Sequence, residues 1–379
     1  MSEEQRPDGR SRTEQEPGSA GRAAPHPADT GLSGSYDLLL LDLDGTVYRG
    51  SEPIVGAESA LAASPSRHLF VTNNASRSPE DVAEHLNALG IHAEFDDVVT
   101  SAQAGARLVA SRLGAGAEVL VVGAPALADE VLGQGLRPVR SFSESVAAVI
   151  QGFSRSVAWS DLAEAALAVR NGAWWVATNV DSTLPDERGL LPGNGSLVAA
   201  LATATGATPT VAGKPGRPIM DDAVRQGGGR RPLVVGDRLD TDIAGACAAG
   251  LDSLLVFTGV STPAETILAA PAMRPTYVAD SLHALAAPAQ ECAVGPQRGW
   301  HAQVDGDMIR VEADREVLET LEEQGGRVVD GPGQVAASSE LSMRGLRAVA
   351  AVAWKHDFQG RIVGADPRIQ ALVRQWHGA

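Results

Sequence analysis

Four consecutive leucines, residues 38–41, lead directly into Asp42, Asp44, Gly45 and Thr46. Such a run predicts a strand buried on both faces, as in the parallel sheet of an α/β fold. Ligands of these sheets bind at the carboxyl ends of strands, where the two aspartates would lie. Two carboxylates there can hold a hard divalent cation, and one of them can attack phosphorus. A strand that ends in a solvated acidic turn is the simpler alternative.

Three more polar motifs follow apolar runs that we predict to be strands of the same sheet. These runs cover residues 68–71, 210–212 and 233–235, and the polar residues after them include Thr72 and Asn73, then Gly213 and Lys214, then Asp237 and Asp242. The carboxyl ends of parallel strands lie at one edge of a sheet, so the four motifs would converge on one site.

Several of these residues have simpler interpretations. Lys214 stands between Gly213 and Pro215 and could belong to a surface turn, and Thr72 could cap a helix. Asp240 and Asp242 could both be acids of the first turn of the following helix, which they would stabilise. We adopt that interpretation for Asp240 but not for Asp242.

The order of the four motifs resembles that of the haloacid dehalogenase superfamily of phosphatases, and in particular subfamily IIA. In that subfamily a cap domain is inserted between the second and third motifs. The resemblance spans residues 36 to 285. It implies an α/β fold: a Rossmann-like parallel-sheet core with an inserted α/β cap of the C2 type, to which this chain adds a small α+β extension at its carboxyl end.

The composition and the alternation of strands and helices divide the chain into four parts. These are a disordered tail (1–34), a hydrolase core (35–100 plus 205–290), a cap (101–204) and a carboxyl-terminal extension (298–379). The core would resume with the strand at 210–212 and would end with a last strand at 254–257.

The resemblance assigns chemical roles to the acidic motifs. Asp42 would be the nucleophile that forms an aspartyl-phosphate, and Asp44 would be the general acid and then the general base. Mg²⁺ would be held by the carboxylates of Asp42 and Asp237 and by the backbone carbonyl of Asp44. Lys214 would neutralise charge on the nucleophile and on the phosphoryl group.

The remaining motif residues would position these groups. The hydroxyl of Thr72 and the backbone N–H of Asn73 would bind phosphate oxygens, and Gly45 would let the backbone approach the phosphate. Asp242 would orient Lys214 or a metal-bound water.

The end of the predicted cap resembles the substrate-specificity loop of the subfamily. Asn179 and Asp181 are candidates for contacts to substrate hydroxyls, although an ordinary connection between a strand and a helix is the alternative. By motif alignment, Leu184 stands where the vitamin B6 phosphatases of the family have a histidine. This difference disfavours an aromatic phosphate ester as substrate.

The extension is compatible with the acetyltransferase-like fragment that actinobacterial members resembling glycerol-3-phosphate phosphatases carry at their carboxyl end. An Asp-Gly pair at residues 305–306 predicts a hairpin there. We find no loop suited to the pyrophosphate of coenzyme A, so the extension is expected to be structural or regulatory and to transfer no acetyl group.

The net charge of −16 argues against nucleic acid or an anionic membrane as a partner. Two cysteines, no apolar amino-terminal segment and no run of 18 apolar residues suggest a cytoplasmic protein without a membrane span. We expect a small phosphorylated metabolite as the substrate, with glycerol 3-phosphate first, and a possible homodimer.

Other functions remain open. The substrate could be phosphoglycolate or a sugar phosphate, and the enzyme could transfer its phosphoryl group to an acceptor other than water. The chain could also be a non-catalytic regulatory protein on a phosphatase scaffold, although the intact acidic motifs and Lys214 argue against this.

Overall fold

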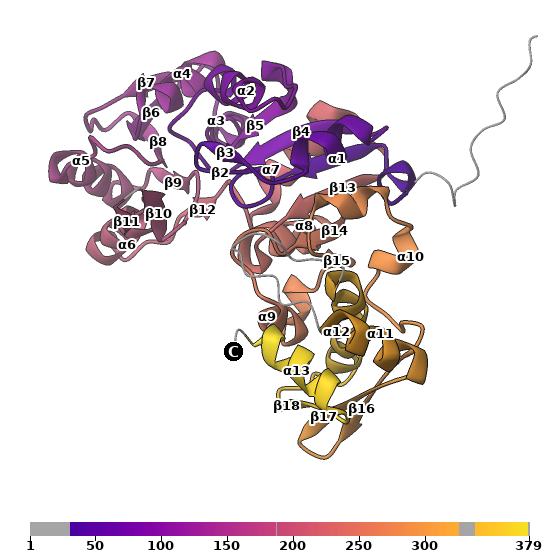
Figure 1. The fold of residues 1–379 in the computed structure, drawn as a ribbon. Coiled ribbons are helices and arrows are strands. Elements are labelled where there is room, and N and C mark those ends of the chain that lie inside the picture. The colour runs from indigo at the N-terminus through magenta and orange to yellow at the C-terminus, as the bar shows by residue number, and fades with distance from the viewer. Residues whose placement is uncertain (1–30, 187, 326–337, 378–379) are drawn as a thin grey trace, which may run out of the picture.

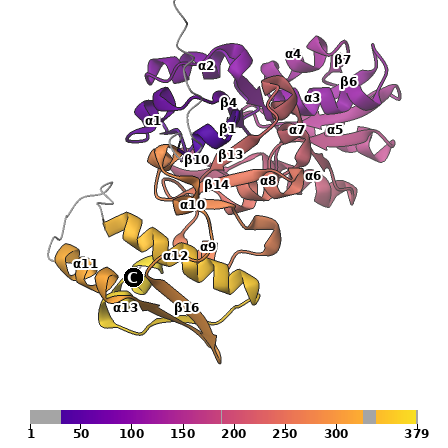
Figure 2. The same ribbon diagram turned by 90° about the vertical axis from the view of Figure 1, so that its right-hand side faces the viewer.

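The computed structural model describes residues 31–186, 188–325 and 338–377. The two views in Figures 1 and 2 show three parts, with the core between the cap and the carboxyl-terminal extension. The predicted α/β fold class is confirmed. None of the helices described is both long and apolar enough to span a lipid bilayer.

The core is a six-stranded parallel sheet in the order β15-β14-β13-β1-β4-β5. Its strands are β1 (Leu38–Leu41), β4 (Arg67–Thr72), β5 (Val98–Thr100), β13 (Pro232–Gly236), β14 (Asp252–Val256) and β15 (Tyr277–Ala279). Helices and short strands around it are α1 (Ala57–Ala63), α2 (Pro79–Ala88), α7 (Arg217–Gly227), α8 (Ala244–Ala249), α9 (Pro263–Ile267), α10 (Ala289–Cys292), β2 (Tyr48–Arg49) and β3 (Glu52–Pro53).

The leucines of β1 explain why this strand lies inside the sheet. All four are buried, and they alternate between two hydrophobic clusters. Leu39 and Leu41 pack in one cluster with residues of α1 and α2, whereas Leu38 and Leu40 pack in the other with residues of α7 and α8. A strand that is covered on both faces has no polar face, which is why the run is uninterrupted.

The cap has its own parallel sheet in the order β12-β9-β8-β6-β7. Its elements are α3 (Ser101–Arg112), β6 (Glu118–Val122), α4 (Pro125–Gly133), β7 (Arg137–Val139), β8 (Val146–Gln151), α5 (Trp159–Arg170), β9 (Trp174–Ala177), the hairpin of β10 (Thr183–Asp186) and β11 (Gly189–Pro192), α6 (Asn194–Thr205) and β12 (Thr210–Val211). This hairpin lies in the segment that resembles the substrate-specificity loop.

Three expectations about the core differ from the structure. Strand β12 pairs with β9 of the cap, so the segment at 210–212 does not belong to the core sheet. Strand β14 is followed by β15, which is only three residues long and therefore carries little sequence signal. Residues 31–34 are not part of a disordered tail, because Leu32 is fully buried and its N–H donates to the Ala287 carbonyl at 2.7 Å. Residues 1–30 of the predicted tail lie outside the described part.

The extension folds as a three-stranded sheet, β16-β17-β18, with helices beside it. Its elements are β16 (Trp300–Asp305), β17 (Met308–Ala313), α11 (Arg315–Gly325), α12 (Ser338–Lys355), β18 (Arg361–Gly364) and α13 (Pro367–Trp376). Strands β16 and β17 are antiparallel, and Gly306 in the turn between them has a φ of +59°. The hairpin predicted from the Asp-Gly pair therefore forms where we expected it.

The extension and the core share one hydrophobic cluster. Leu255 and Val278 of the core strands pack there with Leu346 of α12. Arg347 is 1% exposed, and its guanidinium donates to the Val278 carbonyl at 2.7 Å and to the Glu340 carboxylate at 2.6 Å. The extension thus covers apolar surface of the core and supplies a hydrogen-bond donor to its edge strand.

Replacing Arg347 with alanine should destabilise the junction by about 2–3 kcal/mol, because it leaves a buried carbonyl without its donor. Three of the six tryptophans, Trp300, Trp354 and Trp376, lie in the extension, so fluorescence during urea unfolding reports on this unit. The matched control is Arg315→Ala, whose side chain is 92% exposed and should contribute less than about 0.5 kcal/mol. Equal effects of the two variants would contradict this account.

Candidate active site

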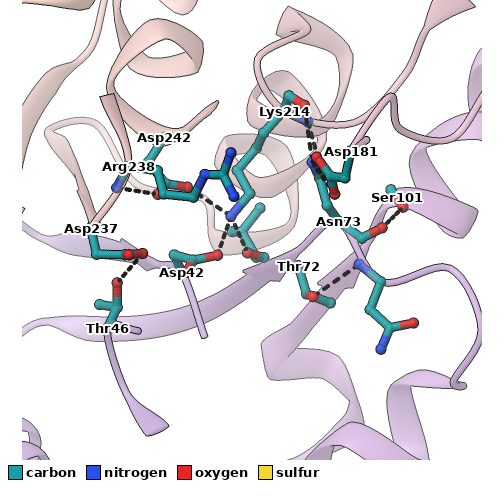
Figure 3. A network of polar contacts seen from close by, with 12 residues as sticks. Asp42, Thr46, Thr72, Asn73, Ser101, Asp181, Lys214, Asp237, Arg238 and Asp242 are labelled. Carbon is teal, nitrogen blue, oxygen red and sulfur yellow. Dashed lines mark hydrogen bonds and ion pairs between the residues drawn. The ribbon is translucent and has the colours of Figure 1, made fainter. Parts of the chain in front are cut away.

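The carboxyl ends of three neighbouring strands bring the acidic motifs together. Strand β1 pairs with β13 on one side and with β4 on the other, so Asp42 lies between the end of β13 and the end of β4. Figure 3 shows Asp42, Asp237 and Thr72 at this edge, with the side chain of Lys214 reaching in among them. The structure therefore gathers all four predicted motifs at one place.

Among the described residues at this edge of the sheet, Lys214 is the only basic residue whose side chain is almost fully buried. It is 3% exposed, and its Nζ donates to the Val71 carbonyl at 3.0 Å. Nζ also forms ion pairs with the carboxylates of Asp42 and, at 2.8 Å, Asp242. Burial by itself would lower the pKa of Lys214, but the charges of Asp242 and Asp42 outweigh it and raise the pKa. The ammonium therefore stays protonated at neutral pH.

Three carboxylates lie together near this ammonium, those of Asp237 and Asp242 buried and that of Asp42 partly buried. Asp42, Asp237 and Asp242 each offer an oxygen, and these oxygens lie within 4.8 Å of one another. Burial raises the pKa of Asp42 to about 6 and that of Asp242 to about 6, and in both the charge of Lys214 opposes the rise. Burial, followed by the charge of Asp242, raises the pKa of Asp237 to about 6.

This cluster fits a divalent cation. Three ionised carboxylates and one ammonium leave two negative charges in a buried place, which is costly without a compensating charge. Carboxylate oxygens are also the ligands that Mg²⁺ prefers. The cluster contains the two predicted carboxylate ligands, Asp42 and Asp237, and adds the carboxylate of Asp242 beside them.

Asp44 and Gly45 follow immediately after Asp42 and Leu43. Asp44 has solvent on one side, but protein surrounds its carboxyl closely enough that burial raises its pKa, against the opposing charges of Lys214 and Arg77. Gly45 has a φ of +90°, and a Cβ there would stand 2.6 Å from Oδ2 of Asp237. Only glycine can therefore hold both the turn and this close approach.

Sequence reasoning missed the loop that follows β14. The backbone N–H of Val260 donates to Oδ2 of Asp237 at 2.6 Å, and a side chain at Gly259 would overlap the same carboxylate. The hydroxyl of Thr258 donates to the Gly45 carbonyl at 2.6 Å. A signal was available, because Thr258 and Gly259 are polar and small residues at a strand end, like the residues of the four motifs.

The predicted phosphate-binding residues occupy the end of β4. Thr72 is buried, and its hydroxyl accepts a hydrogen bond from the Asn74 N–H at 3.1 Å. Thr72 does not cap the next helix, because Ser78 performs that role by accepting from the Asp81 N–H at 3.1 Å. The side chain of Asn73 bonds to the backbone of Lys214.

Two of the three predicted cap residues reach the core. Asn179 is 3% exposed, and its amide donates to the Asn73 carbonyl at 2.7 Å. The carboxylate of Asp181 accepts from Nδ2 of Asn73 at 3.2 and 3.3 Å. Leu184 is half-buried in β10, where it pairs with Leu191 of β11. The amide of Asn179 is therefore occupied by protein groups.

Two arginines near the site were not singled out from the sequence. Arg238 holds the exposed carboxylate of Asp240 through two hydrogen bonds of 3.0 and 2.8 Å, and it lies close enough to Asp181 for their charges to interact. The charge of Arg77 likewise interacts with Asp44 and opposes the rise of its pKa. Asp240 thus stays outside the acidic cluster.

Comparison with known proteins agrees with this geometry. The model of haloacid dehalogenase-like hydrolases matches residues 39–137, and a model of similar hydrolases matches residues 211–285. The chain is 50% identical to D-glycerol 3-phosphate phosphatase of Mycobacterium tuberculosis over 353 residues, which are 91% of this chain and 95% of that protein. It is 39% identical to an acid sugar phosphatase of Staphylococcus saprophyticus over 66% of this chain and 96% of that protein.

Solved structures show the same relationship. A glycerol phosphate phosphatase from Mycobacterium tuberculosis in complex with magnesium superposes with a TM-score of 0.82 and 49% identity, over 91% of this chain and 98% of that one. A thermostable NPPase from Geobacillus stearothermophilus superposes with a TM-score of 0.59 and 39% identity, over 65% of this chain and 97% of that one. The chain belongs to the haloacid dehalogenase-like hydrolases.

Proposed function

We propose that this chain is a Mg²⁺-dependent phosphatase that hydrolyses glycerol 3-phosphate through an aspartyl-phosphate on Asp42. The observation that carries the proposal is the ion pair of the buried Lys214 ammonium with Asp42 and Asp242 at the carboxyl ends of the core strands. This arrangement supplies a carboxylate nucleophile and a fixed positive charge beside it, which phosphoryl transfer requires.

The chain's own residues divide the chemistry between them. Asp42 attacks phosphorus in line with the leaving alkoxide, and Lys214 neutralises charge on the nucleophile and on the transferring group. Asp44 gives a proton to the leaving oxygen and then takes one from the attacking water. Its raised pKa favours the protonated form that the first of these steps needs.

The acidic cluster would hold the metal through the carboxylates of Asp42 and Asp237 and the backbone carbonyl of Asp44. Asp242 would remain paired with Lys214. When bound, Mg²⁺ acts as a Lewis acid that polarises the phosphoryl group. Thr72 and the backbone N–H of Asn73 bind the phosphate, and Gly45 gives the backbone room to approach it.

Glycerol 3-phosphate is proposed because the 50% identical relative carries that name and the resemblance extends through the carboxyl-terminal extension. The cap also lies over the strand ends, with Asn179 and Asp181 bonded to Asn73 of the core. A closed cap admits a small ester and excludes a macromolecular one. Leu184 in place of a histidine disfavours an aromatic ester.

The remaining expectations are part of the same proposal. The net charge of −16 supports a partner other than nucleic acid, and the two free cysteines support a reducing, cytoplasmic setting. The exposed Trp159 and Leu190 of the cap offer apolar surface for a homodimer. Light scattering of the purified protein tests the oligomeric state.

Replacing Asp42 with asparagine should lower kcat by several orders of magnitude, because an amide cannot form the covalent intermediate. Phosphate release with Mg²⁺ measures this, and Asp240→Asn is the control because that carboxylate is exposed and paired with Arg238. Phosphate release by Asp42→Asn at the wild-type rate would refute the nucleophile assignment. A wild-type protein that releases no phosphate from any ester would point to the non-catalytic alternative.

Removal of Mg²⁺ should destabilise the protein in a pH-dependent way. The folded pKa of about 6 for Asp42, Asp237 and Asp242 exceeds the ordinary value of 3.8, so the metal-free protein loses stability as the pH rises from about 4 to above 6. Mg²⁺ competes with protons for these carboxylates. Thermal unfolding with Mg²⁺ or a chelator should therefore show a larger metal effect at about pH 7.5 than at about pH 5. An equal effect of Mg²⁺ at both pH values would count against this cluster as the metal site. Asp237→Asn should abolish the stabilisation by Mg²⁺.

The order of kcat/KM should place glycerol 3-phosphate ahead of phosphoglycolate, hexose phosphates and pyridoxal phosphate, because a missing hydroxyl leaves polar groups of the closed site unpaired. Initial rates across this panel measure the order, and added acceptor alcohols test for phosphoryl transfer to groups other than water. A tenfold preference for pyridoxal phosphate would overturn the substrate assignment. A preference for phosphoglycolate would correct the substrate and keep the reaction.

A further inference from the structure

The side chain of Asn73 joins the core, the Lys214 loop and the cap. Its Oδ1 accepts from the backbone N–H of Lys214 at 2.8 Å, and its Nδ2 donates to the Lys214 carbonyl at 3.0 Å. The same Nδ2 donates to the carboxylate of Asp181 in the cap at 3.2 and 3.3 Å. Figure 3 shows Asn73 between Lys214 and Asp181.

These contacts use both N–H donors of the amide and one of the two acceptor positions on its oxygen. An asparagine has two N–H donors and one carbonyl acceptor. One N–H is taken by the Lys214 carbonyl, the other by Asp181, and the carbonyl oxygen by the Lys214 N–H. The reverse orientation of the amide would place an NH₂ group against the Lys214 N–H, so the contacts themselves determine the orientation.

The two-point contact fixes the backbone from which the Lys214 side chain extends. Gly213 lets this approach occur, because a Cβ there would lie 2.5 Å from Oδ1 of Asn73. From this backbone, Nζ reaches the carbonyl of Val71 at 3.0 Å and the carboxylates of Asp42 and Asp242. A shift of the Lys214 backbone would therefore move the ammonium relative to Asp42.

The cap side of the contact is equally constrained. The N–H of Asp181 donates to Oδ1 of Asn179 at 3.2 Å, and Nδ2 of Asn194 donates to the Asn179 carbonyl at 2.7 Å. The N–H of Gly195 donates to the Asp181 carbonyl at 2.9 Å. The carboxylate of Asp181 is thus presented to Asn73 by a segment tied to the start of α6.

We propose that Asn73 is a positioning residue that makes the placement of Lys214 depend on the docking of the cap through Asp181. The inference rests on the proposed function, since Lys214 matters only if the site transfers a phosphoryl group. It assigns Asp181 a role different from a contact to substrate hydroxyls. When the cap leaves, Asn73 loses its charged acceptor, and the amide is free to turn away from the Lys214 backbone.

The first test is Asn73→Asp, which keeps the size of the side chain. It removes both N–H donors and sets a carboxylate against that of Asp181. We expect kcat to fall about tenfold to a hundredfold, with KM changed less than about threefold, because Lys214 acts mainly on the charge of the transition state. The loss should be the same for glycerol 3-phosphate and for p-nitrophenyl phosphate, which has no alcohol groups to contact.

The second test exchanges the partners. The double variant Asn73→Asp with Asp181→Asn restores an amide donor facing a carboxylate, and we expect kcat about tenfold above that of Asn73→Asp alone. If Asp181 instead contacts substrate hydroxyls, Asp181→Asn would raise KM for glycerol 3-phosphate and leave p-nitrophenyl phosphate unaffected, and the exchange would restore nothing. That result would overturn the inference.

Asn171→Asp is the matched control, because Asn171 is an exposed residue of the cap at the end of α5 and should keep wild-type kinetics. A wild-type protein that hydrolyses no ester would refute the proposed function but not this inference. Crystal structures of Asn73→Asp and Asp181→Asn decide that case: a displaced Lys214 backbone supports the inference, and an unmoved one refutes it.

Discussion

The buried ion pairs of Lys214 with Asp42 and Asp242 are the interaction on which the site depends. An ammonium at 3% exposure loses most of its hydration, and the nearby carboxylates and the Val71 carbonyl compensate for that loss. The same carboxylates would repel one another without the ammonium. Each charge is therefore tolerated because of the others, and the strand ends hold them within reach. The remaining negative charge is what makes the cluster suitable for a divalent cation.

The fold supplies this arrangement through one simple property of β1. Its four leucines fill hydrophobic clusters on both faces of the sheet, which places the strand between β13 and β4. The first residue after the leucines is Asp42, at the edge where the neighbouring motifs also end. The cap is then connected so that Asn179 and Asp181 reach the same edge. Burial and charge are thus concentrated at the carboxyl-terminal edge of the sheet.

The features that were predictable from the sequence are those that depend on local pattern. The run from Leu38 to Thr46 identifies both a buried strand and its acidic end, and the family and fold class inferred from the four motifs are confirmed. The partners of Asn73 were not predictable, because its side chain meets Lys214 across 141 residues of the chain. The hydrogen bond from the Val260 N–H to Asp237 was not predictable for a different reason, because a backbone donor has no sequence signature. The assignment of residues 210–212 to the core failed because a two-residue strand fits either sheet equally well.

The position of β12 has a consequence for the modularity of this enzyme class. This strand is the edge of the cap sheet, yet Ala212 and Gly213 continue from it directly into Lys214. The N–H groups of Ala212 and Gly213 bond to Ala177 and Thr178, so the cap also holds the start of the lysine loop. A cap grafted from another protein therefore cannot be joined at the end of α6. The transplanted segment must include its own last strand and must place the recipient's lysine at the same position after that strand. The cap and the lysine loop would therefore have to be exchanged together.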